Sequence, residues 1–260
     1  LIAFEGLSIL SLLIQKKRIP AVIWIQTAIT FVAFVILFMA PGNEIRVASE
    51  ITTWMPGYKE LSVGKHLFMT IQWMLSSFAN EGKAFFIAIW AAGFLLLIKS
   101  KKAKVYQILA IVFSVAAILP YAGITFFSEM GIGDIDIEQC LTELPTWQSM
   151  TTQNRIAFFW WIAAVLFTLV LLWKVTGHSV FISMVFLGGI ASEAVLYFSP
   201  TIYASGARVY YLTDLMYLFI ILWMVMRMDS EKKKNLFIAG AAALGIINFL
   251  SQYSIMLLKL

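Results

Sequence analysis

An asparagine and an arginine follow a long apolar run, and both side-chain types bind phosphate. The run, residues 21–39, contains no charged residue, and Pro41 and Gly42 separate it from Asn43 and Arg46. A run of this length can cross a bilayer as a helix, which proline and glycine then end. Arginine binds phosphate through paired hydrogen bonds, so Arg46 is a candidate ligand for a phosphate at headgroup level. The simpler interpretation is a helix end whose arginine extends to the membrane surface.

Further ionisable and polar residues fall near the ends of other apolar segments. They are Glu5, His66, Glu193, Arg208, Tyr210 and Asp214. Ionisable groups at membrane depth are costly and usually face a cavity or a charged partner, and a carboxylate can serve as a general base. Structural alternatives stay open. Glu5 could be purely structural, Glu193 and Asp214 could each pair with an arginine inside a helix bundle, and His66 could be an ordinary interfacial residue.

The composition indicates the scaffold that must position these groups. The chain has 260 residues, of which 61% are hydrophobic and 13% charged, and its mean hydropathy is +0.88. Soluble domains carry about 25% charged residues. We therefore predict an all-α polytopic membrane helix bundle, forming a single transmembrane domain over residues 1–260. The net charge of +5 belongs to loops and indicates no nucleic-acid partner.

The apolar segments predict about eight crossings and one interfacial helix. The crossings are expected at about 1–15, 20–40, 82–98, 105–127, 155–173, 179–198, 209–227 and 236–258. The amphipathic stretch 66–80 is the expected interfacial helix, after a long polar stretch at 41–65. An acidic loop is expected at 128–154.

Basic residues set the expected orientation. Lys and Arg concentrate in short connections around 16–18, 99–104, 174 and 227–234. The positive-inside rule makes that side cytoplasmic. The candidate residues then gather at the outer face of the membrane.

Two motifs carry a resemblance to a known family. They are Ala40-Pro41-Gly42-Asn43-Glu44-Ile45-Arg46 after one apolar segment and the stretch from Ser199-Pro200 to Arg208 before another, with Glu5-Gly6 as a weaker third element. Together they resemble an uncharacterised family of bacterial polytopic membrane proteins. That family is itself similar to the GT-C superfamily of membrane glycosyltransferases, including O-antigen glucosyltransferases.

The resemblance implies a glycosyltransferase in the bacterial cytoplasmic (inner) membrane. A polyprenyl-phosphate sugar would be the donor, and a cell-envelope glycan or lipid the acceptor, at the outer face. Arg46 and Arg208 would hold the phosphate, while His66, Glu193, Tyr210 and Asp214 would line the substrate site with Asn43. The catalytic carboxylate of GT-C enzymes lies near their first transmembrane helix, so we expect it before Leu1, in a longer protein, and Glu5 is a substitute candidate. No cofactor is implied, and a divalent cation stays open.

Two other functions fit the sequence. One is a transporter or flippase for a lipid-linked or small polar substrate, which would place charges near the bilayer midplane and break helices in symmetric halves. The other is a non-catalytic partner in an envelope-polymer assembly machine, in which Arg46 and Arg208 would tolerate alanine. No internal repeat is visible, and the ionisable residues gather toward one side, which favours the transferase.

Overall fold

All regular structure in the described part of the chain is helical. The computed structural model describes residues 2–39, 43–122, 146–177, 180–201 and 209–258. The α-helices are α1 (Ile2–Ile14), α2 (Ala21–Phe38), α3 (Asn43–Trp54), α4 (Val63–Asn80), α5 (Lys83–Leu97), α6 (Lys104–Ile118), α8 (Thr152–Val175), α9 (Val180–Ala194), α10 (Tyr211–Met226) and α11 (Glu231–Leu258). Short 3-10 helices are η1 (Tyr58–Glu60), η2 (Lys101–Ala103), η3 (Leu119–Ala122) and η4 (Val195–Phe198). The all-α prediction is confirmed for these residues.

The predicted number of about eight crossings is wrong for the described residues. Two segments are long and apolar enough to span a membrane, Lys104–Tyr121 and Thr152–Val175, and a bent pair of helices makes up to three. The reason is helix length. α1, α5, α9 and α10 are each shorter than the segment predicted for them and have only 13, 15, 15 and 16 residues. At about 1.5 Å per residue, helices this short fall below the roughly 30 Å of a hydrocarbon core.

A helix occupies much of the expected polar stretch 41–65. α3 runs from Asn43 to Trp54, and its residues 44–49 are exposed. Arg46 and Glu50 are one turn apart and form an ion pair of 2.7 Å along this helix. The polar composition thus reflects an exposed helix, a possibility that hydropathy alone does not separate from a loop.

The helix predicted at 66–80 exists as α4, but several of its polar residues are buried. Thr70, Gln72 and Ser77 are at most 5% exposed, whereas Leu67 is 53% exposed. An interfacial helix would expose its polar face. α4 and α5 are instead joined at Glu81-Gly82 with a bend of 68°, and together they are apolar enough for one broken span.

The corner between α4 and α5 is closed by one backbone acceptor. The carbonyl oxygen of Ser77 accepts hydrogen bonds from the N–H groups of Glu81 at 2.8 Å and Gly82 at 2.9 Å. The N–H of Phe85 then bonds to the Gly82 carbonyl at 3.0 Å, which starts α5. Both helix ends thereby keep backbone partners across the turn.

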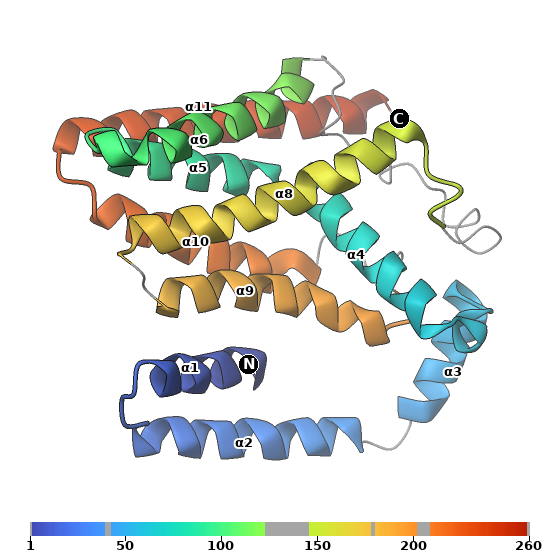
Figure 1. Cartoon of the computed structure of the whole chain (residues 1–260). Helices are drawn as coiled ribbons and strands as arrows, with labels where there is room; N and C mark the ends of the chain where they lie inside the picture. The colour runs from blue at the N-terminus through green and yellow to red at the C-terminus, as the bar shows by residue number, and fades with distance from the viewer. Residues whose placement is uncertain (1, 40–42, 123–145, 178–179, 202–208, 259–260) are drawn as a thin grey trace. The chain divides into compact units, whose positions relative to one another are not determined.

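The chain divides into two compact units, which we describe separately. The first comprises Leu1–Met74, Asp134–Met150 and Ser179–Met216, so it includes the first part of α4 and the start of α10. In it, α1 packs against both α2 and α9, and α1 and α2 form an antiparallel hairpin (Figure 1). Many side chains of α2 are exposed and apolar, including Trp24, Phe31 and Phe34. Such a surface is typical of a helix that contacts lipid or another apolar surface.

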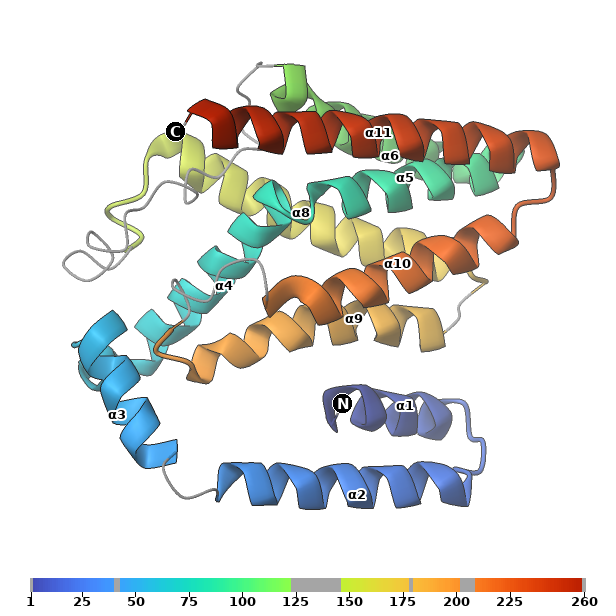
Figure 2. The ribbon, with the colours of Figure 1, turned by 180° about the vertical axis from the view of Figure 1, so that it is seen from behind.

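The second unit contains Leu75–Gly133, Thr151–His178 and Tyr217–Leu260. Its centre is α5, which packs against α6, α8 and α11; Figure 2 shows α11 running along α5 and α6. Aromatic rings fill this core: Phe86 lies 5.5 Å from Trp161 and 5.7 Å from Trp90, measured between ring centroids. The indole N–H of buried Trp90 donates to the Thr168 hydroxyl at 2.8 Å, so α5 and α8 are joined by a buried hydrogen bond.

Candidate functional site

A buried carboxylate lies in the first unit. Glu5 on α1 is 9% exposed, and its Oε1 accepts a 2.7 Å hydrogen bond from the Thr30 hydroxyl of α2. Its Oε2 is buried and has no hydrogen-bond partner among the described residues. Leaving a carboxylate oxygen without a partner in an apolar surrounding is costly. Such a group commonly marks a functional position or a contact that a ligand completes.

A second buried carboxylate occurs on α9, the helix that packs against α1. Glu193 is 1% exposed. Its neighbour Ser192 lies 2.8 Å from the Thr213 hydroxyl of α10, and the Ser192 hydroxyl donates to the Gly189 carbonyl at 2.7 Å. Asp214 follows Thr213 and is half-buried. Glu193 and Asp214 therefore each follow, in sequence, one of two hydroxyl residues that join α9 to the start of α10.

His66 belongs to an aromatic and hydroxyl cluster. Its Nε2 lies 3.1 Å from the Tyr58 carbonyl oxygen, and its ring stands edge-on to the Tyr58 ring at 4.6 Å between centroids. The Tyr197 ring lies 5.4 Å from the His66 ring, measured between centroids. The Tyr58 hydroxyl donates to the Tyr197 carbonyl at 3.2 Å, so segments 139 residues apart are held together. We call these residues, with Ser199, the His66 cluster.

The His66 cluster lines a small cavity. The cavity has a volume of about 10 Å³, and its lining includes Tyr58, His66, Tyr197 and Ser199. That is room for about one water molecule. Burial, and secondarily the nearby Tyr197, raise the pKa of the Tyr58 phenol above its ordinary value of 10.0. Tyr58 therefore stays neutral at pH 7 and keeps its hydroxyl proton as a donor.

An apolar cluster packs against Tyr58 of the His66 cluster. Met55, Met69 and Trp73 are buried together, and Tyr210 packs against them. The ring centroids of Trp73 and Tyr210 are 5.1 Å apart. His66 and Trp73 lie two turns apart on α4. The predicted residue His66 is therefore part of the same helix segment that the second predicted residue, Tyr210, contacts through Trp73.

Among the predicted phosphate ligands, the structure describes the side chain of Arg46. Arg46 lies on α3 with its side chain 77% exposed, paired to Glu50. Asn43 is the first residue of α3, and its side chain lies outside the described residues. Arg208 also lies outside them, as does most of the acidic loop. Ser199, the start of the second motif, is described, and its hydroxyl lies 2.8 Å from that of Thr201.

The sequence did not predict several polar residues of this region as site residues. Tyr58, Tyr197 and Ser199 line the cavity beside His66, and Gln72 on α4 is 3% exposed with its Oε1 lacking a partner among the described residues. The two tyrosines carry no sequence signal, because their roles depend on contacts distant in the chain. Gln72 could have been noticed as an uncharged polar residue within an apolar segment.

The chemistry available here is acid–base and hydrogen-bonding chemistry. The described residues contain no group of three or more His, Cys, Asp or Glu side chains able to hold a metal ion. Comparison with known proteins adds no assignment, since no family model, curated protein or solved structure matches the chain. The functional conclusion therefore depends on the site itself.

Proposed function

We propose that the protein is a membrane-embedded glycosyltransferase. It would transfer a sugar from a polyprenyl-phosphate donor to a cell-envelope glycan or lipid at the outer face of the bacterial inner membrane. The observation that carries this proposal is Glu5, a buried carboxylate with one oxygen held by Thr30 and the other without a hydrogen bond in the described chain. Transfer to a hydroxyl acceptor needs a base that removes its proton, and a carboxylate can serve.

The donor phosphate has candidate ligands in the two sequence motifs. Arg46 is exposed and pairs with Glu50 along its own helix. An exposed ion pair of this kind is worth about 0–1 kcal/mol, so a phosphate could displace Glu50 from the guanidinium. Arg208 is the second proposed ligand. Positive charge at this position would stabilise the phosphate that leaves as the sugar bond breaks.

We propose that the sugar lies against the outside of the His66 cluster, because the cavity itself has room for about one water molecule. The cluster combines aromatic rings with a histidine nitrogen, a phenol and a serine hydroxyl. Aromatic faces pack on the apolar face of a sugar, while hydroxyl groups and ring nitrogens hydrogen-bond its hydroxyls. Tyr210, anchored on Trp73, would extend this surface, and Glu193 and Asp214 would complete the polar lining.

The proposal is tested by sugar transfer in membranes that contain the full-length protein. Wild type is compared with Glu5→Gln, which keeps the shape of the side chain and its acceptor for Thr30 but removes the base. We expect transfer to fall by about 10²–10⁴-fold, the usual contribution of a general base. Arg46→Ala and Arg208→Ala should each reduce transfer as well.

Matched controls separate catalysis from stability. Glu44→Gln neutralises an exposed carboxylate on α3, and Arg18→Ala removes an exposed arginine far from both motifs in sequence. Both controls should retain wild-type transfer at equal membrane levels. Unchanged transfer in Glu5→Gln would refute its role as base, and unchanged transfer in both arginine variants would refute the phosphate clamp.

One observation favours a second function, transport of a lipid-linked or small polar substrate. The α4–α5 pair is bent by 68°, and α4 carries two buried polar residues, Thr70 and Gln72. Broken helices with polar linings form binding sites in transporters. A reconstituted flipping assay tests this directly: movement of a fluorescent lipid-linked sugar that survives Glu5→Gln would favour transport over transfer.

A further inference from the structure

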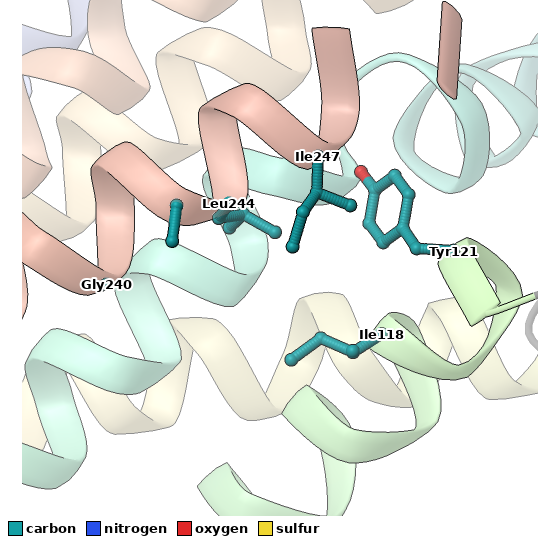
Figure 3. A pocket seen from close by; sticks show the side chains of 6 residues that line it. Ile118, Tyr121, Gly240, Leu244 and Ile247 are labelled. Carbon is teal, nitrogen blue, oxygen red and sulfur yellow. The ribbon is translucent and has the colours of Figure 1, made fainter. Parts of the chain in front are cut away.

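A groove with an apolar lining lies within the second unit. Ile118 and Tyr121 form one wall, and Gly240, Ala243, Leu244 and Ile247 of α11 form the other. Figure 3 shows the Tyr121 ring beside Ile247, with Ile118 and Leu244 facing the same space. The volume of the groove is about 310 Å³, within the range of small-molecule sites of about 300–1,000 Å³.

The groove owes its space to small residues on α11. A Cβ atom added at Gly240 would meet no other atom within 4 Å. Gly240, Ala243, Leu244 and Ile247 recur at the three- and four-residue spacing of one helix face, over two turns. Two turns give a short slot, which suits a flexible hydrocarbon chain better than a further helix. One wall belongs to Lys104–Tyr121, a segment apolar enough to span the membrane, so lipid chains are the expected neighbours.

Opposite charges flank one end of this groove. The Lys83 ammonium lies 4.7 Å from the centroid of the Tyr121 ring, and Lys83 is 8% exposed. Glu81, two residues earlier at the corner between α4 and α5, is exposed. A phosphate would be attracted to Lys83 and an amine to Glu81. One cation and one anion match a zwitterionic headgroup better than an anionic one.

We propose that this groove binds a zwitterionic phospholipid with a primary amine, of the phosphatidylethanolamine type. One acyl chain lies between Ile118 and α11, the phosphate faces Lys83, and the amine faces Glu81. The site lies within the second unit and does not depend on glycosyl transfer. It would attach the η3–α11 contact to the surrounding bilayer.

Native mass spectrometry of the purified full chain tests this site. The protein in detergent is titrated with phosphatidylethanolamine, phosphatidylglycerol or phosphatidylcholine carrying identical acyl chains. We expect phosphatidylethanolamine to bind about tenfold more tightly than phosphatidylglycerol, equivalent to about 1.4 kcal/mol. Glu81→Gln should remove this preference, and Lys83→Gln should weaken binding of all three lipids.

Two glycines on α11 provide a matched pair. Gly240→Leu fills the groove and should lower phosphatidylethanolamine affinity about tenfold. Gly245→Leu adds the same side chain where a Cβ also meets nothing within 4 Å, but away from the groove lining, and should bind like wild type. Ala243→Leu, which narrows the same groove, is a second filling variant if Gly240→Leu fails to fold. Equal affinity in the Gly240, Ala243 and Gly245 variants would overturn the groove, and a preference for phosphatidylglycerol would overturn the headgroup assignment.

Discussion

Gly93 on α5 permits the close contact between α5 and α8, and adding one methyl group tests it. A Cβ at Gly93 would lie 2.7 Å from Cδ2, 3.0 Å from Cγ and 3.2 Å from Cδ1 of Leu171. Carbon atoms pack best at about 3.5–4.0 Å. Leu171 is 0% exposed, so its side chain must move within the protein interior to relieve the contact. Gly93→Ala therefore forces a shift in a fully packed interface.

Two opposing terms set the size of the effect. Overpacking of a core costs about 1–3 kcal/mol. Replacing glycine by alanine inside a helix returns about 0.5–1 kcal/mol. We expect Gly93→Ala to lower the free energy of unfolding by about 0–2.5 kcal/mol. Gly245→Ala, where a Cβ meets nothing within 4 Å, should instead raise it by about 0.5–1 kcal/mol.

Unfolding titrations of the purified protein in detergent, followed by helical circular dichroism, measure both values. A double-mutant cycle makes the test specific, because Leu171→Ala removes all three contacting atoms, Cγ, Cδ1 and Cδ2. In that background Gly93→Ala should become stabilising, with a coupling energy of about 1–3 kcal/mol. If Gly93→Ala destabilises equally in both backgrounds, the close approach of α5 and α8 is not its cause, and the reasoning fails.

Two further predictions concern polar contacts. Thr30→Val removes the donor to Glu5 Oε1 and should lower the free energy of unfolding by about 1–3 kcal/mol, because a buried carboxylate oxygen loses its partner. The loss should vanish in a Glu5→Met background, and persistence there would assign it to packing of the valine. Hydrogen bonds from Lys233 and Lys99 lower the pKa of Asp229 from 3.8 to about 2. The stability from this carboxylate is present above pH 3.8 and is lost as the pH falls through about 2, so Asp229→Asn should flatten the melting-temperature profile in that window, most clearly at low salt. Identical profiles for wild type and variant would contradict the prediction.

The helix positions were largely predictable because their ends carry strong signals. Lys16 and Lys17 follow α1, Pro20 precedes α2, and the lysines at 99–104 separate α5 from α6. Charged residues and proline interrupt apolar runs for direct physical reasons, desolvation and the missing N–H. Such signals fix where a helix lies, but they do not report how its faces are covered.

The arrangement of the candidate site was not predictable in the same way. The sequence marked His66, but its partners Tyr58 and Tyr197 come from a 3-10 turn and from a segment more than a hundred residues later. Likewise the amphipathic pattern of 66–80 indicated a water-facing polar side, whereas Thr70 and Gln72 are buried. Periodicity shows that a helix has two faces, and only tertiary packing decides which face meets solvent.

The corner at Glu81-Gly82 fixes the rotational phase of two helices. The Ser77 carbonyl accepts hydrogen bonds from the N–H groups of both Glu81 and Gly82, and this fixes the backbone path through the turn. Each residue advances an α-helix by about 100°, so inserting a single residue here would rotate α5 by roughly that angle. Phe86 and Trp90 are now fully buried; Phe86 would swing away from Trp161, and Trp90 from its hydrogen-bond partner Thr168. The packing of the core therefore constrains the number of residues in this turn as well as the identity of the buried side chains.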